Sequence, residues 1–259
     1  MSESLVLYTV ANRIATITLN RPDKKNALSA ELVSQLTETI LDAADDDLVK
    51  VIILKANGNV FSAGADLAYL QQLQNNSHEE NLTDSRNLEK LFKAIYYLPK
   101  IVIAQVEGHA IAGGCGLATV CDIIFSVPEA KFGYTEVKLG FVPAIVSCFL
   151  LRKTSETLAK RLLLTADLFS AQQALDFGLI TFLAEKDEID AKVLEFSLNL
   201  CEQASSNALM VTKQLIGQTT NPSLEKSLDI AVQINARVRE SADFKRGVAS
   251  FLNKESIQW

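Results

Sequence analysis

The amino-acid sequence predicts an α/β fold that is followed by a helical region. Over the first two-thirds of the chain, short β-branched segments alternate with longer segments of helical periodicity. From about Ile189 the pattern is helical nearly to the end. A chain of 259 residues is long enough to bury a core without disulfide or metal support. We therefore expect an α/β core over residues 1–188 and a helical C-terminal region over residues 189–259.

The first predicted unit consists of two strands and a helix. Val6–Val10 and Ile14–Leu19 alternate as half-buried strands do, and the three residues between them suit a turn. Ser29 is a suitable N-cap for a helix from Ala30 to about Ala44, whose leucine, isoleucine and alanine side chains recur on one face.

Three further strands are predicted from apolar runs that are typical of strands buried on both faces. They are Val51–Lys55, Ile101–Val106 and Asp122–Ser126. A helix is expected at Asn87–Leu98, whereas the polar residues 71–85 predict a mobile surface loop. In the C-terminal region, the pair Asn221-Pro222 interrupts the helical pattern, which resumes over Ser223–Glu240.

Composition and charge disfavour several classes of function. The net charge of −6 disfavours a nucleic-acid-binding role. No apolar run reaches the length of a membrane span, and the first residues lack the features of a signal peptide, so we expect a cytoplasmic protein. The chain has four cysteines without a C-x-x-C pair and only two histidines, so we expect no metal site. The cysteines, each among apolar residues, are expected to be inert and buried.

Two segments place small residues where a predicted strand gives way to a helix. These are VFSAGADLAYL at residues 60–70 and EGHAIAGGCGLATVCD at residues 107–122. Small side chains allow backbone N–H groups at such turns to approach a ligand, and the helix N-terminus adds positive partial charge. Two such turns side by side would supply a pair of donors for a developing oxyanion.

These segments resemble the motifs of the crotonase (enoyl-CoA hydratase/isomerase) family. The motifs FSAGADL and AIAGGCGLATVCDI have RPDKKNALS upstream and AKFGYTEVKLGFVPA downstream, in the family's order and spacing. The resemblance extends from about Ile14 to Phe251. It implies a spiral of ββα units with a C-terminal helical oligomerisation region that builds homotrimers or hexamers. It also implies an acyl-CoA substrate, so that coenzyme A enters as part of the substrate and no other cofactor is needed.

The resemblance also implies the catalytic groups. By motif position, the thioester carbonyl would lie between the backbone N–H groups of Ala65 and Gly113. Enolate chemistry also needs a general acid/base, and Glu136 in KFGYTEVKLG matches the family's shared glutamate. We expect structural roles for His109, as a packed side chain, and for Asp122.

The contacts with coenzyme A follow from the same motifs. Lys24, Lys25 and Ala27 match the segment that lies along the pantetheine and phosphates, although a solvated turn is the alternative. The segment at residues 60–70 would add contacts with coenzyme A from Ala63, Asp66 and Leu67, and Asp66 would cap or orient its turn. Phe251 and Lys254 match a C-terminal F-x-x-K through which a neighbouring subunit reaches the nucleotide.

The sequence departs from the usual hydratase pattern at Gly116, where such enzymes commonly have a second glutamate. We expect the space beside this glycine to hold substrate or water. Bulky Ile145 and Val146 replace the usual PGxGGT residues and should reshape the acyl pocket. Ala144 lies near the aspartate of dienoyl-CoA isomerases and aryl-CoA dehalogenases, which disfavours both activities.

Three interpretations of this departure remain open. Hydration of a 2-enoyl-CoA, perhaps branched or carboxylated, is the first choice, because TEVKLGFVPAIVS resembles a bacterial subgroup associated with methylglutaconyl-CoA hydration. A site with one glutamate also resembles Δ3,Δ2-enoyl-CoA isomerases. The third interpretation is a noncatalytic acyl-CoA-binding protein.

Overall fold

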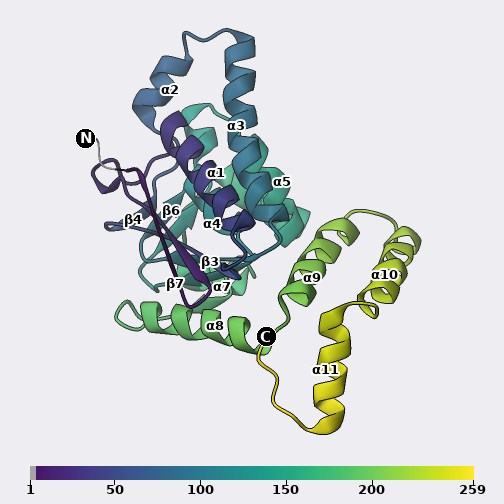
Figure 1. Ribbon diagram of the computed structural model, residues 1–259. Helices are drawn as coiled ribbons and strands as arrows, with labels where there is room; N and C mark the ends of the chain where they lie inside the picture. The colour runs from purple at the N-terminus through teal and green to yellow at the C-terminus, as the bar shows by residue number, and fades with distance from the viewer. Residues whose placement is uncertain (1–3) are drawn as a thin grey trace.

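The computed structural model describes residues 4–259 and contains two sheets flanked by helices (Figure 1). The larger sheet has the strand order β1 (Val6–Ala11), β2 (Ile14–Leu19), β3 (Val51–Ala56), β5 (Ile101–Val106), β7 (Ile123–Ser126) and β10 (Phe182–Leu183). The smaller sheet has the order β4 (Val60–Ser62), β6 (His109–Ile111), β8 (Lys131–Gly133) and β9 (Phe169–Ser170).

Helices follow the strands and then continue alone. The core helices are η1 (Pro22–Lys24), α1 (Ala30–Asp45), α2 (Leu67–Leu73), α3 (His78–Tyr97), α4 (Gly113–Val120), η2 (Glu136–Leu139), α5 (Ala144–Lys153), α6 (Glu156–Thr165) and α7 (Ala171–Asp176). The remaining helices are α8 (Ile189–Gln203), α9 (Ser206–Thr219), α10 (Leu224–Val238) and α11 (Ala242–Asn253).

The predicted spiral of ββα units is confirmed. In the pairs β3–β4, β5–β6 and β7–β8, the first strand joins the larger sheet and the second joins the smaller sheet, whereas β9 and β10 follow the opposite order. The strands β2, β3, β5 and β7 pair in parallel, as do β4, β6 and β8. Each unit therefore moves the chain one strand along both sheets, and the turns after β4 and β6 come to lie side by side.

The first unit forms as its sequence predicts. Strands β1 and β2 are antiparallel and meet at a turn in which Asn12 and Arg13 both have positive φ. Ser29 caps α1 by accepting a hydrogen bond from the backbone N–H of Leu32, at 3.3 Å. The face of α1 that carries Leu36 and Ile40 is buried in the core.

The prediction of a surface loop over residues 71–85 is wrong. Helix α2 continues to Leu73 and α3 begins at His78, nine residues before the predicted Asn87. Ser77 starts α3 with a capping box, because its hydroxyl accepts from the N–H of Glu80 while the Glu80 carboxylate accepts from the N–H of Ser77. This S-x-x-E signal outweighs the polar character of the segment.

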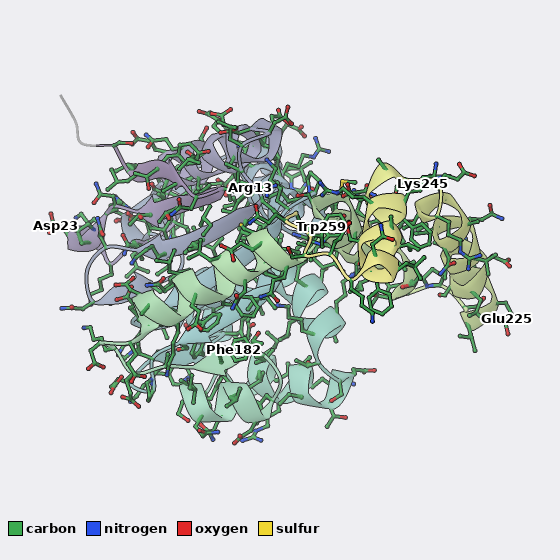
Figure 2. The ribbon with its side chains drawn as sticks, turned by 60° about the horizontal axis from the view of Figure 1, so that its bottom comes forward. Arg13, Asp23, Phe182, Glu225, Lys245 and Trp259 are labelled. Carbon is green, nitrogen blue, oxygen red and sulfur yellow. The ribbon has the colours of Figure 1, made fainter. Side chains whose placement is uncertain are left out.

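Helix α8 belongs to the core although it opens the predicted C-terminal region. It begins at Ile189 and packs against β2, β3, β5 and β7, with Val193 and Cys201 buried. Figure 2 shows it lying across the sheet. Asp190 anchors its first turn through an ion pair with Lys55 of β3, at 2.7 Å.

Helices α9, α10 and α11 extend to one side of the core (Figure 1). Lys213 of α9 reaches back to the core, where its ammonium pairs with Asp122 at 2.7 Å. The chain then returns, and the guanidinium of Arg13 donates to the main-chain oxygen of Trp259; the two residues lie close together in Figure 2. Neither α10 nor α11 buries a side chain within the single chain. Their exposed apolar residues include Leu224, Leu228, Val232, Phe244, Val248, Phe251 and Leu252.

The expectation of buried cysteines holds for three of the four. Cys115, Cys121 and Cys201 are buried, and burial raises the pKa of the Cys115 and Cys121 thiols to about 12. Cys148 is exposed, because it falls on the outward side of α5. Over residues 4–259, no helix has the length and apolarity needed to cross a membrane.

Candidate active site

A cavity of about 620 Å³ opens between two turns, helices α1, α2 and α3, and the segment from η2 to α5. The turns are residues 63–66, after β4, and residues 112–113, after β6. We call them the first and second oxyanion turns, after the role expected from the sequence. It gathers most of the residues that the sequence singled out. Those that line it are Lys24, Lys25, Ala27, Ala63, Ala65, Asp66, Leu67, Gly113, Glu136, Ile145 and Val146. Ala144, the residue that disfavours two related activities, also lines it.

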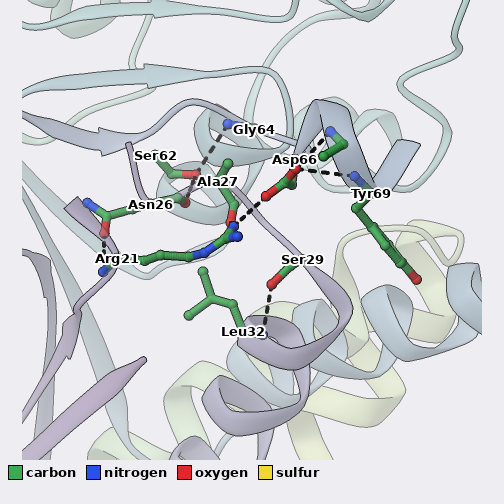
Figure 3. A network of polar contacts seen from close by, with 10 residues as sticks. Arg21, Asn26, Ala27, Ser29, Leu32, Ser62, Gly64, Asp66 and Tyr69 are labelled. Atoms are coloured by element: carbon green, nitrogen blue, oxygen red, sulfur yellow. Dashed lines mark hydrogen bonds and ion pairs between the residues drawn. The ribbon is translucent and has the colours of Figure 1, made fainter. Parts of the chain in front are cut away.

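The loop at residues 21–29 contributes Lys24, Lys25, Ala27, Leu28 and Ser29 to the lining of this cavity and is held by buried polar contacts (Figure 3). The Asn26 side chain is fully buried; its amide donates to the carbonyls of Asn57 and Val60, at 2.9 and 2.8 Å. Its oxygen accepts from the N–H of Arg21, at 2.9 Å. Lys25 and Asn26 both adopt positive φ. The segment is thus a fixed loop, and it places Lys24 and Lys25 at the cavity.

An ion pair joins this loop to the first oxyanion turn. The Arg21 guanidinium donates to the Asp66 carboxylate at 2.5 Å and to the Ala27 carbonyl at 3.2 Å, as Figure 3 shows. Asp66 also caps α2 by accepting from the N–H groups of Ala68 and Tyr69. The hydrogen bond from Arg21, together with those from the backbone, lowers the pKa of Asp66. Asp66 therefore stays ionised and orients the turn, as the sequence suggested.

The first turn leaves the N–H of Ala65 without an acceptor among residues 4–259. Its neighbours are all engaged: Ala63 N–H donates to Lys25 O at 3.0 Å, and Asp66 N–H donates to Leu28 O at 3.1 Å. Gly64 has a φ of +87°, a conformation that glycine adopts without strain. A half-buried N–H with no protein partner at a cavity is available to a ligand.

The second turn is built on an unusual backbone conformation. Ala112 has a φ of 49° and a ψ of −125°, which costs free energy for a residue with a β-carbon. Its own N–H donates to Gly133 O at 2.7 Å, and its carbonyl accepts from Gly116 N–H at 3.0 Å. The next amide, that of Gly113, begins α4 and donates no hydrogen bond within the part of the chain that the structure describes.

The two turns are in direct contact. A β-carbon placed on Gly64 would lie 2.8 Å from Ala112 Cβ, 2.9 Å from Ile111 O and 3.3 Å from the Gly113 nitrogen. Only glycine permits this approach. The available amides of Ala65 and Gly113 therefore lie in adjacent turns that line the same cavity.

Glu136 brings a carboxylate to this cavity. It starts η2 just after β8, and its side chain is only 7% exposed. Burial raises the pKa of Glu136, and no cation is among the causes. Its Oε2 is the one buried side-chain oxygen or nitrogen without a hydrogen-bond partner among residues 4–259. A desolvated carboxylate with a free oxygen can accept and return a proton.

The expectation of open space beside Gly116 is wrong. Gly116 is buried in α4, and a β-carbon on it would overlap Val146 Cγ1 and lie 3.1 Å from Phe92 Cε1. Gly116 is also absent from the lining of the cavity, whereas Val146 is part of it. The valine of α5 therefore occupies the position toward which a second carboxylate would project.

Four other residues that the sequence singled out do not line the cavity. Phe251 is 84% exposed on α11 and Lys254 ends that helix, so neither lines the cavity of the same chain. His109 is exposed and not packed as expected; its Nδ1 accepts a hydrogen bond from the Lys131 N–H at 3.2 Å. Asp122 has the expected structural role, because it accepts from the Val102 N–H at 2.8 Å and pairs with Lys213.

The sequence did not reveal several residues that shape the site. Arg21 and Asn26 act on partners far along the chain, and the strained backbone of Ala112 has no side-chain signature. Tyr69 and Asp84 form a hydrogen-bonded pair that also lines the cavity. Tyr69 lies just before the segment that was predicted to be a loop, and Asp84 lies within it. The S-x-x-E capping signal at Ser77 would have placed Asp84 on a helix.

Known proteins resemble this chain over most of its length. Residues 9–259 match the family described as "Enoyl-CoA hydratase/isomerase". A Thermus thermophilus protein named "Putative enoyl-CoA hydratase" is 40% identical over 244 residues, which cover 93% of this chain and 95% of the relative. The trans-2-decenoyl-[acyl-carrier-protein] isomerase of Streptococcus mutans is 27% identical over 251 residues, which cover 96% of this chain and 95% of the relative. The crystal structure of an enoyl-CoA hydratase from Shewanella pealeana matches with a TM-score of 0.94 and 31% identity, covering 100% of this chain and 97% of that one.

Proposed function

The chain belongs to the enoyl-CoA hydratase/isomerase family, and we propose that it catalyses the reversible hydration of a 2-enoyl-CoA with Glu136 as the proton-transferring group. One observation carries this proposal. Among residues 4–259, a buried carboxylate with an unpartnered oxygen lines the same cavity as two backbone N–H groups that have no acceptor and lie in adjacent turns.

The two amides suit the charge that develops during the reaction. When a nucleophile adds to C3 of a 2-enoyl thioester, the electrons of the double bond move toward the thioester oxygen. Hydrogen bonds from Ala65 N–H and Gly113 N–H to that oxygen would stabilise the resulting enolate. A fixed donor of this kind contributes about 3–4 kcal/mol in comparable sites. Because both donors belong to the backbone, they do not depend on the side chains at these positions.

Glu136 would then move one proton between water and C2. As the water oxygen bonds to C3, the free carboxylate oxygen accepts the proton that the water loses. The carboxylic acid so formed returns that proton to C2 of the enolate, and the double bond is converted into a hydroxyl at C3 and hydrogen at C2. The raised pKa of Glu136 suits this role, since a general acid/base works best with a pKa near the working pH.

The remaining expectations extend this proposal to the coenzyme A portion. Lys24 and Lys25, held at the cavity by the Asn26 loop, would contact the pantetheine and phosphates. Phe251 and Lys254 would reach the nucleotide of a neighbouring subunit in a homotrimer or hexamer, consistent with the apolar faces that α10 and α11 leave exposed. A cytoplasmic location remains part of the proposal.

Isomerisation is the second candidate, and one observation favours it. Val146 fills the place beside Gly116, so Glu136 lacks a second glutamate there to help hold water. A single base that removes a proton from C2 of a 3-enoyl-CoA and returns it to C4 needs no water. The S. mutans relative carries the name of an isomerase.

The acyl group is the finer part of the proposal. Ile145 and Val146 both line the cavity, and their bulk would reshape the space available to the acyl group. A branched 2-enoyl group, such as that of 3-methylglutaconyl-CoA, therefore remains our proposal for the substrate.

A panel of 2-enoyl-CoAs and 3-enoyl-CoAs, including 3-methylglutaconyl-CoA, tests the proposal. Products are resolved by chromatography and mass spectrometry after incubation with the protein. Hydration adds the mass of water, whereas isomerisation changes retention without changing mass. Binding without turnover across the whole panel would support the noncatalytic alternative instead.

A further inference from the structure

Tyr69 and Asp84 connect the two helices that form one wall of the cavity. The hydroxyl of Tyr69, on α2, donates a hydrogen bond to the carboxylate of Asp84, on α3. Both side chains line the cavity, together with Leu70, Leu73 and Leu88 from the same helices. In Figure 3, the Tyr69 ring points away from Asp66.

Helix α2 has few other means of attachment. Its seven residues include no buried side chain, and Leu67 is 69% exposed. At its start the helix is held by the Asp66 cap and the Arg21–Asp66 ion pair. The hydrogen bond from the Tyr69 hydroxyl to the Asp84 carboxylate joins a side chain of α2 to a side chain of α3. Its loss would remove this side-chain link between α2 and α3, while the Asp66 cap still holds the start of α2.

The position of Asp84 separates this contact from the second oxyanion turn. Phe92, which faces Gly116 of α4, is eight residues further along α3 than Asp84. At a rise of 1.5 Å per residue, the two lie about 12 Å apart along the helix. Asp84 therefore lines the cavity well away from Gly116, in a wall to which α2 and α3 also contribute Leu70, Leu73 and Leu88.

The chemistry of the pair makes the hydrogen bond persistent. Burial, followed by the effect of the Asp84 carboxylate, raises the pKa of Tyr69 to about 12. The hydroxyl therefore remains protonated near neutral pH and can donate to the carboxylate. Hydrogen bonds to charged acceptors are stronger than those between neutral groups.

We propose that the Tyr69–Asp84 hydrogen bond closes the acyl end of the cavity and sets the length of the acyl group that the protein accepts. This inference rests on the proposed acyl-CoA function of the same cavity. While the bond is intact, α2 and α3 are held together and an extended chain meets a polar contact. When the bond is broken, the leucines of the two helices can separate around a longer chain.

Binding of saturated acyl-CoAs tests this without any turnover. Isothermal titration with free coenzyme A, butyryl-CoA, octanoyl-CoA and dodecanoyl-CoA is compared for the wild type and four variants. Tyr69→Phe removes the donor while keeping the ring, and Asp84→Ala removes the acceptor. Asp84→Asn keeps an acceptor oxygen. Tyr97→Phe is the matched control, since Tyr97 is exposed on α3 and does not line the cavity.

We expect Tyr69→Phe and Asp84→Ala to raise the affinity for dodecanoyl-CoA relative to butyryl-CoA by about tenfold, the worth of a net hydrogen bond to a charged group. Asp84→Asn should give a smaller change, and Tyr97→Phe none. Free coenzyme A should bind equally to all five proteins, and melting curves identify any variant that has lost its fold. The proposal is overturned if Tyr69→Phe folds normally and leaves the ratio of affinities unchanged, or if it weakens every acyl-CoA equally. A failure of the proposed function would appear differently, as acyl-CoAs that bind the wild type no better than free coenzyme A.

Discussion

A β-carbon added to Gly116 would overlap Cγ1 of Val146 and lie 3.0 Å from Val146 Cβ. The two residues thus form a matched pair, in which a valine on α5 requires a glycine on α4. The pair explains how this chain can lack a glutamate at residue 116 without leaving a cavity in its core.

This pair predicts how a second carboxylate can be introduced. Gly116→Glu alone should destabilise the fold by about 1–3 kcal/mol, because its side chain overlaps Val146 in a packed region. Combined with Val146→Gly, the glutamate gains room, and hydration of crotonyl-CoA should rise above the wild-type rate. Urea unfolding and a hydration assay of both variants check this. A single variant that is as stable as the wild type would show that the overlap does not matter.

The contact between the oxyanion turns predicts a large effect of a single methyl group. Gly64→Ala places a β-carbon against Ile111 O and the Gly113 amide, so it should separate the two donors and lower kcat about 10²–10³-fold. Gly178→Ala is the control: Gly178 also has positive φ, at 71°, but a β-carbon there would meet nothing within 4 Å. Steady-state kinetics should show normal turnover in the control. Equal losses in both variants would mean that backbone strain alone, rather than the turn contact, is responsible.

The burial of Glu136 predicts a pH dependence of stability. Because its pKa is raised in the folded protein, the folded state holds the proton more strongly than the unfolded state, and this stabilisation is lost as pH rises through the folded pKa. Glu136→Gln does not titrate. The variant should therefore gain stability relative to the wild type as the pH rises from about 4 to about 8. Urea unfolding at both pH values measures the difference, and a difference that does not change with pH would contradict a costly buried charge.

The exposed end of α11 predicts a contribution to nucleotide binding from another subunit. The double variant Phe251→Ala/Lys254→Ala should weaken the binding of free coenzyme A about tenfold, since a stacked ring and an ammonium are both lost. Lys245→Ala, on the exposed surface of the same helix, is the control. Calorimetry gives the affinity and light scattering shows whether the assembly is intact. An unchanged affinity in an intact oligomer would exclude this contact.

Local sequence signals predicted most of the fold. The strands Ile14–Leu19 and Ile101–Val106 were predicted at their observed bounds, because β-branched apolar runs between turn residues have few alternatives. Ser29 was identified as a cap because a capping interaction is also local: its hydroxyl accepts from a residue three positions away. The start of α3 was missed because its first turns are polar and lack an apolar stripe.

The site was less predictable where it depends on distant residues. The oxyanion turns were visible as glycine and alanine next to strands, and Glu136 stood out through its motif. The filling of the space beside Gly116 was not visible, since it depends on how α5 packs on α4. The Arg21–Asp66 ion pair joins residues 45 positions apart, and a single sequence gives no sign of it.

The central claim is that Glu136 transfers the proton during hydration, and its most direct test is the kcat of Glu136→Gln on the best 2-enoyl-CoA of the panel. We expect a loss of about 10²–10⁴-fold, the usual contribution of a general acid/base, with coenzyme A affinity unchanged because we assign the nucleotide to Phe251 and Lys254 and not to Glu136. A product heavier than the substrate by one water, formed by the wild type, identifies the reaction. A variant that folds, binds acyl-CoA and turns over within a few-fold of the wild type would contradict the assignment.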